Sequence, residues 1–139
     1  MPTLRPLTLP VIAALFLSDP AVAATPAPCQ VLSAAAWSRV MGYTASATPG
    51  ELTCTYQGPP RTGGGQFRIM ATVGSKAEAD AAVKRMREHQ SKGHNLGLSA
   101  VDSQGSVVFS VALFQPAPTE ATPAQLEKLV AAIKLQLAQ

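Results

Sequence analysis

The chain has 139 residues, enough for one domain with a single hydrophobic core and too few for several domains. Eleven lysines and arginines against eight aspartates and glutamates give a net charge of +3. This mild charge is spread along the chain without long like-charge runs, which argues against a nucleic-acid-binding arm. We therefore expect no nucleic-acid partner.

The first residues have the pattern of a cleavable secretory signal peptide. An apolar segment, residues 7–17, follows Arg5 and is too short to cross the roughly 30 Å apolar layer of a bilayer as a helix. Residues 21–23 (Ala-Val-Ala) then have the small-x-small pattern that signal peptidase recognises. We predict cleavage after Ala23 and a periplasmic or secreted protein of residues 24–139, 116 residues (139 minus 23) without stable membrane insertion.

The chain contains two cysteines, Cys29 and Cys54. In an oxidising compartment, an even number of cysteines in a short exported domain is typical of a disulfide bond. Closing a loop of about 26 residues would stabilise the fold by roughly 3 to 4 kcal/mol in the chain-entropy description. Two free thiols or a metal-binding pair are the alternatives.

The mature chain is expected to begin with an extended linker, residues 24–28, because proline and alanine dominate it. The fold itself is expected to start at Cys29. A first helix is predicted between Ser33, a favourable N-cap, and Gly42, a favourable residue for ending a helix. Trp37 lies on its apolar stripe and is expected in the core.

A hairpin is predicted next. Residues 53–57 and 67–73 have the alternating pattern of strands, and the glycine- and proline-rich residues 58–65 between them predict a slack loop. The apolar side chains expected on one buried face of the second strand are Phe67, Ile69, Ala71 and Val73.

A second helix is predicted after Ser75, since Ser75 and Glu78 match a capping box and apolar residues recur at helical spacing up to Gly93. Strands are then predicted at residues 96–102 and 106–114. The latter strand is apolar on both faces, so we expect it in the centre of the sheet.

The last helix is predicted from a second capping box, Thr122 and Gln125. Its apolar stripe consists of Leu126, Leu129, Val130, Ile133 and Leu137. The element order is thus helix, two strands, helix, two strands, helix. It predicts an α+β fold for residues 29–139, with a four-stranded, mainly antiparallel sheet and the helices packed on one face.

Candidate catalytic and metal-binding residues are few. His89 and His94 are the two histidines, and neither lies in a recognisable nucleophile signature. Their spacing straddles the expected helix end, which is unfavourable for a metal pair, and we expect Met70 and Met86 to pack in the core. We predict no enzyme activity, no metal site and no cofactor.

Basic side chains gather in the hairpin loop and near the end of the second helix. They are Arg61, Lys84, Arg85, Arg87 and Lys92. We take these residues as the candidate interaction surface, suited to an acidic partner or anionic lipid head groups. Interleaved acidic residues, Asp80 and Glu88, also fit an ordinary solvated helix face.

Residues 29–33 (Cys-Gln-Val-Leu-Ser), a short helix ending at Gly42, and residues 54–56 (Cys-Thr-Tyr) form a pattern. It resembles that of a loose group of small secreted bacterial proteins and lipoproteins of unknown function. The resemblance implies a compact α+β domain, a disulfide between Cys29 and Cys54, and a non-enzymatic role in the cell envelope. It transfers no functional residues, and this chain lacks the lipobox that many members carry.

Together these observations favour an exported, non-enzymatic interaction module that binds another envelope protein, as an inhibitor, an immunity factor or an accessory subunit. One alternative is a periplasmic carrier of a small apolar ligand or metal, held between sheet and helices. The other is a hydrolase with an unrecognised site that depends on His89 or His94.

Overall fold

The computed structural model describes residues 25–90, 99–114 and 121–139. The predicted signal peptide, residues 1–23, lies outside these ranges, as do Lys92 and His94. In chain order the described elements are α2 (Pro28–Val31), α3 (Ala34–Met41), β1 (Ser46–Pro49), β2 (Thr53–Gln57), β3 (Gly64–Thr72), α4 (Lys76–Gln90), β4 (Ser99–Gln104), β5 (Val107–Phe114) and α5 (Thr122–Leu137).

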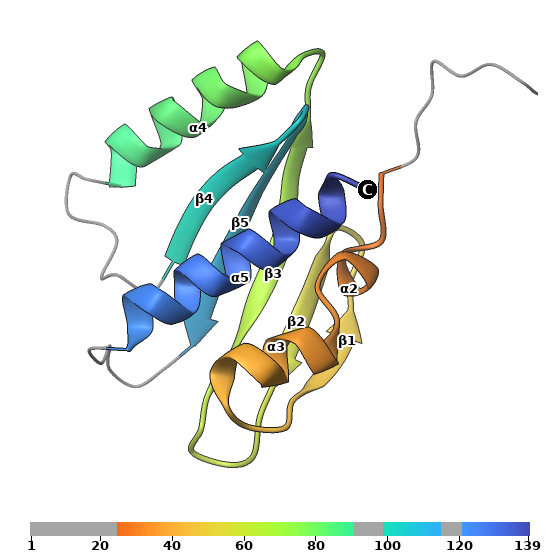
Figure 1. Ribbon diagram of the computed structural model, residues 1–139, viewed down its shortest axis with the longest axis vertical. Coiled ribbons are helices and arrows are strands. Elements are labelled where there is room, and N and C mark those ends of the chain that lie inside the picture. Colours follow the sequence, from red (N-terminus) through yellow and green to blue (C-terminus); the bar gives the residue numbers. More distant parts are fainter. Residues whose placement is uncertain (1–24, 91–98, 115–120) are drawn as a thin grey trace, which may run out of the picture.

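The strands form one antiparallel sheet in the order β1-β2-β3-β5-β4, which confirms the α+β class (Figure 1). Strand β5 is an interior strand between β3 and β4, whereas the centre of the sheet, where β5 was predicted, is occupied by β3. The prediction of four strands is wrong, because the described sheet has a fifth strand, β1. This edge strand has little apolar alternation and ends in Pro49. It forms because its backbone pairs with β2 across a tight turn, where the Gly50 amide donates to the Thr53 carbonyl at 2.8 Å.

Helices pack on both faces of the sheet, which corrects the prediction that they share one face. Phe109 of β5 belongs to the main core with α2, α3 and α5, whereas the adjacent Val108 packs with Ala79 and Val83 of α4. Successive side chains of a strand point to opposite faces. Helix α4 therefore lies on the other face, at the β4 end of the sheet (Figure 1).

A β-bulge in β3 divides the strand between the two faces. The register shifts between Ile69 and Ala71, which pair with consecutive residues of β5. Residues before the bulge enter the main core, and Ala71 and Val73 pack beneath α4. The prediction of a single buried face for this strand is therefore wrong. Met70, expected in the core, is 40% exposed at the bulge.

Helix boundaries follow the capping residues in two of three cases. The Ser33 hydroxyl accepts a hydrogen bond from the Ala36 amide at 3.1 Å, and Gly42 ends α3 with a φ of 81°. The Ser75 hydroxyl accepts from the Glu78 amide at 3.2 Å, which is one half of the predicted capping box. The Glu78 carboxylate accepts the Gly74 amide at 3.1 Å, where a capping box would use the Ser75 amide.

The capping box predicted at the start of α5 is wrong. Thr122 is already the first helical residue, the N-cap is Ala121, and Ala121 makes no side-chain capping bond.

The start of the fold also differs from the expected linker, because Pro28 is buried as the first residue of α2. None of the described helices is long and apolar enough to cross a membrane.

The main core is organised around Trp37, which is fully buried as predicted. Its ring stacks on that of Tyr56, with centroids 4.2 Å apart and planes 5° from parallel. The indole N–H donates to the Tyr43 hydroxyl at 3.2 Å. The Tyr56 hydroxyl donates to the Leu32 carbonyl at 2.5 Å, and burial raises the pKa of Tyr56, so its phenol stays neutral.

Substitution of Gly65 tests this packing. A Cβ at this position would lie 2.3 Å from the Trp37 ring and 2.2 Å from the Ala112 carbonyl oxygen. Gly65→Ala is therefore expected to reduce the free energy of unfolding by about 1 to 3 kcal/mol. Urea unfolding followed by Trp37 fluorescence measures the change. Gly74→Ala is the control, because its nearest contact would be 3.4 Å away; equal losses in both variants would contradict the prediction.

Cys29 and Cys54 form a disulfide that joins α2 to β2, with Cα atoms 5.0 Å apart. The predicted bond is confirmed, and the alternatives of free thiols or a metal pair are excluded, because neither cysteine is free. A disulfide is consistent with an oxidising compartment.

The double variant Cys29→Ala/Cys54→Ala is expected to lose about 3.5 kcal/mol of stability, because the bond closes a loop with a sequence separation of 25. Urea unfolding of the variant and of the oxidised protein measures the difference. A loss below about 1 kcal/mol would mean that the unfolded chain is not constrained by this loop.

Candidate interaction site

The structure separates the basic residues that were predicted to form one interaction surface. Lys84, Arg85 and Arg87 lie on α4, at the top of Figure 1, whereas Arg61 lies in the β2–β3 loop at the bottom. Lys92 is outside the described residues. The four described residues therefore do not make a single surface.

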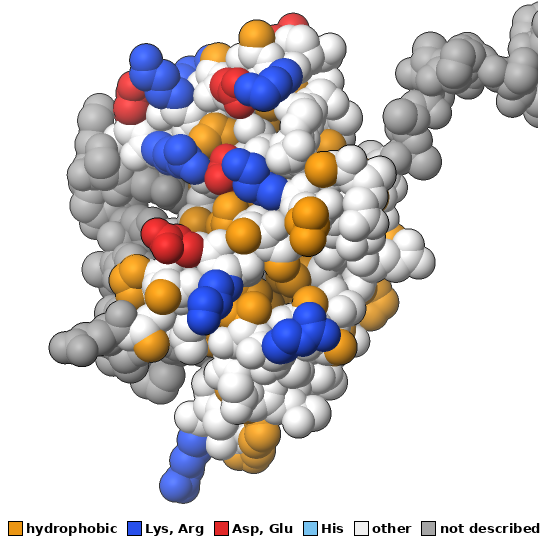
Figure 2. All heavy atoms as spheres, in the orientation of Figure 1, with side chains coloured by type: hydrophobic (Ala, Val, Ile, Leu, Met, Phe, Trp, Pro, Cys, Tyr) orange, Lys and Arg blue, Asp and Glu red, His pale blue; other side chains and the backbone are white. Residues whose placement is uncertain are grey.

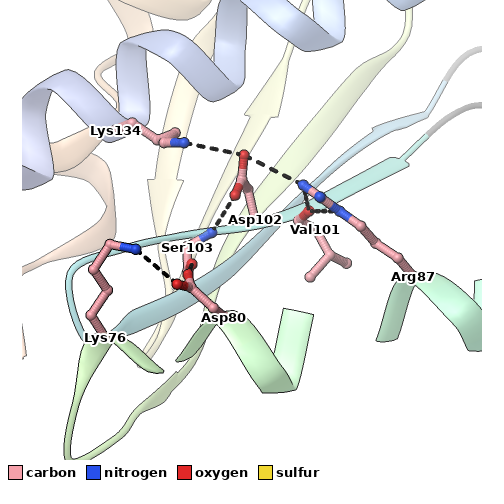
Figure 3. A network of polar contacts seen from close by, with 7 residues as sticks. All are labelled: Lys76, Asp80, Arg87, Val101, Asp102, Ser103 and Lys134. Carbon is pink, nitrogen blue, oxygen red and sulfur yellow. Dashed lines mark hydrogen bonds and ion pairs between the residues drawn. The ribbon is translucent and has the colours of Figure 1, made fainter. Parts of the chain in front are cut away.

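Arg87 is used within the molecule. Its guanidinium donates two hydrogen bonds to the Val101 carbonyl, at 3.0 and 2.9 Å, and lies 3.5 Å from the Asp102 carboxylate (Figure 3). Lys134 of α5 lies 3.6 Å from the same carboxylate oxygen. Asp102 thus connects α4 and α5, which lie on opposite faces of the sheet, at the outer edge of β4 (Figure 3).

These contacts also occupy the edge of β4. The Val101 carbonyl accepts its hydrogen bonds from Arg87, and the Ser103 amide donates to the Asp102 carboxylate at 2.7 Å. Unpaired groups on an edge strand are a template for another strand. Because these two groups have side-chain partners, this stretch of β4 is poorly suited to strand addition by a partner protein.

A hollow of about 500 Å³ lies between α4 and β4. Within it the Asp80 carboxylate accepts hydrogen bonds from Lys76 at 2.8 Å and from the Ser103 hydroxyl at 3.3 Å (Figure 3). The hydrogen bond from Lys76 lowers the pKa of Asp80. A carboxylate with a lowered pKa is a weak general base, so this geometry is unfavourable for activating the Ser103 hydroxyl as a nucleophile.

The Asp102 contacts predict a measurable effect on stability. Asp102→Asn keeps an acceptor for the Ser103 amide but removes the charge shared by Arg87 and Lys134. Because the Asp102 side chain is only 22% exposed, we expect a loss of about 1 kcal/mol, at the upper end for surface ion pairs. Thermal and urea unfolding at low and high salt check this loss, which should shrink as salt is added.

Lys76→Gln provides the matched control. Its ion pair with Asp80 is exposed, at 76% and 53% of the two side chains, and a cation in the first turn opposes the helix dipole. We therefore expect little change in stability. An equal effect of the two substitutions would contradict a specific role for Asp102.

A second hollow, of about 470 Å³, lies where the β2–β3 loop meets the end of β5. We call it the loop hollow. It is lined by Thr55, Tyr56, Gln57, Gly58, Pro59, Pro60, Arg61, Gly63, Gly64 and Phe114. None of these lining residues is acidic. Over the β2–β3 loop, at the bottom of Figure 2, basic and apolar side chains are seen and acidic ones are not.

The strand register shows which residues border the loop hollow. Gln57, Gly64 and Phe114 form one row across β2, β3 and β5. Gly64 contributes no side chain to this row, and a Cβ there would lie 2.1 Å from the Tyr56 carbonyl oxygen, so no larger residue fits. Leu113 is buried in the main core, and Phe114 therefore points to the opposite face, where it is 54% exposed.

Residues 58–63 form a tight loop instead of the slack loop that was predicted. The Gly58 amide donates to the Gly63 carbonyl at 3.1 Å. The amide and the hydroxyl of Thr62 both donate to the Pro59 carbonyl, at 3.1 and 2.5 Å. Two consecutive prolines restrict the backbone further. The shape of the loop is therefore set before any partner binds.

Arg61 occupies an unusual position in this loop. Its φ is 71°, and it is the single non-glycine residue at positive φ in the described part of the chain. This conformation costs about 1 kcal/mol or more for a residue with a Cβ, so the surrounding loop must hold it. Among the described residues, no ion pair involves Arg61. Its charge is thus available to a ligand.

The sequence pointed to Arg61 but not to Phe114. Phe114 was expected in a strand covered on both faces, and its exposure arises because α4 covers only the β4 end of the second face.

His89, the described histidine, lies on an exposed part of α4. Within residues 25–90, 99–114 and 121–139, no three His, Cys, Asp or Glu side chains form a metal-binding group.

No protein family, curated protein or solved structure matches this chain. Function is therefore inferred from the geometry of its surface.

Proposed function

We propose that this chain is an exported, non-enzymatic interaction module that binds another envelope protein through the loop hollow. Its role would be that of an inhibitor, an immunity factor or an accessory subunit. The observation that carries the proposal is the pairing of an unneutralised arginine, Arg61, with a half-exposed aromatic ring, Phe114, in one hollow. Arginine and aromatic residues supply much of the binding energy at protein interfaces.

The rigidity of the site supports this proposal. Hydrogen bonds join the loop residues on either side of Arg61, and strand pairing holds Phe114 opposite Gly64. Binding to a preorganised surface avoids much of the entropy cost of ordering loops and side chains. The Cys29–Cys54 disulfide supports the placement in an oxidising compartment, together with the signal peptide that the sequence predicts.

A groove of about 370 Å³ between β4 and α5 favours a second candidate function, a carrier of a small apolar molecule. Its walls include Ala100, Leu126 and Val130. Its size is at the low end for ligand sites. Four charged residues also line it: Arg87, Asp102, Glu127 and Lys134. So many charges suit an apolar ligand poorly, and the loop hollow is therefore the better supported site.

Site-specific photocrosslinking tests the proposed function. Phe114 is replaced by photoreactive benzoylphenylalanine, which keeps an aromatic ring in the loop hollow, and the protein is expressed in its own host. We expect one discrete adduct with an envelope protein. Excess unlabelled protein should suppress it, whereas an unlabelled Phe114→Ser variant should not.

The control places the same photoreactive residue at Leu135, which is 69% exposed on α5, on the other face of the sheet. An identical set of adducts from both positions, or no adduct from position 114, would count against the loop hollow as a docking site.

A further inference from the structure

Building on the proposed function, we infer that the loop hollow takes an acidic segment of the partner, in which a carboxylate lies next to a large apolar side chain. The carboxylate pairs with Arg61. The apolar side chain packs on Phe114 and on the neighbouring prolines.

The charge of the hollow selects the carboxylate. Arg61 is the one charged residue among those that line it. Arg68 lies on the same face of β3, two rows from the hollow, and is also exposed. Neither arginine has an ion pair among the described residues. A guanidinium binds a carboxylate through two parallel hydrogen bonds, which gives both energy and orientation.

The exposed ring of Phe114 selects the apolar neighbour. A purely acidic segment would leave a ring that is 54% exposed uncovered in the interface. A purely apolar segment would cover Arg61 without a partner and so bury an unpaired charge, which is costly. A segment that carries both groups satisfies Arg61 and Phe114 together.

Anionic lipid head groups are less suitable occupants. Each basic residue near a membrane surface adds only a weak attraction, so membrane binding requires several of them together. The loop hollow offers Arg61 with Arg68 nearby, while the basic residues of α4 lie at the other end of the molecule (Figure 1). A peptide that fits the hollow makes fuller use of one arginine and one aromatic ring.

Peptide selection tests the inference. A random peptide display library is panned on the immobilised, disulfide-bonded protein, and the affinity of enriched peptides is measured by fluorescence polarisation. We expect the enriched peptides to combine Asp or Glu with Leu, Ile, Phe or Trp within a few residues. Arg61→Gln and Phe114→Ser should each weaken binding about tenfold or more.

Lys84→Gln is the matched control, since Lys84 is an exposed basic residue of α4 at the other end of the molecule. It should leave peptide affinity within about twofold, a change of less than about 0.5 kcal/mol. Arg61→Glu should abolish binding of the acidic peptides and favour versions in which the acid is replaced by lysine.

Enrichment of neutral or basic peptides, no enrichment, or equal binding by Arg61→Gln would overturn the inference. Binding to phosphatidylglycerol vesicles in place of peptides would do the same. If crosslinking from position 114 still yields its partner while acidic peptides fail, the proposed function stands and only the chemistry assigned to the partner is wrong. If both fail, the proposed function falls as well.

Discussion

The close packing of Trp37 is the constraint on which the rest of the fold depends. Its ring stacks on Tyr56 of β2 and meets the backbone of β3 at Gly65, where no side chain fits. The Tyr56 hydroxyl ties the same stack to the chain just before α3. The disulfide reaches β2 two residues earlier, at Cys54. These contacts join α2, α3, β2 and β3 and so set the end of the sheet at which the loop hollow forms.

Features that depend on local chemistry could be predicted from the sequence. Ser33 and Gly42 bound α3 because capping needs only neighbouring residues, and Cys29 with Cys54 left one possible bond. The strand at residues 53–57 was likewise predicted correctly, as was a strand within residues 106–114 that lies inside the sheet and not at its edge. In each case, the pattern along the chain contains the relevant information.

Features that depend on a distant partner could not be predicted. Strand β1 exists because its backbone pairs with β2, and the bulge at Met70 arises from the match between β3 and β5. The exposure of Phe114 depends on where α4 packs, and the neutralisation of Arg87 depends on Asp102, fifteen positions away in sequence. The candidate site was therefore found only in part, through Arg61.

Among the described helices, α4 is the one that packs on the second face of the sheet, and the two faces differ in how much they bury. Its buried cluster contains Ala79, Val83, Val101 and Val108, far fewer residues than the main core contains. Segments with few buried contacts open locally at lower free energy than the whole domain unfolds. Helix α4 is therefore expected to detach from the sheet at a lower free energy than the main core unfolds. Such an opening would release Arg87 from the edge of β4. It would also expose the second face of the sheet from Phe114 to Val108, while the main core around Trp37 stays intact.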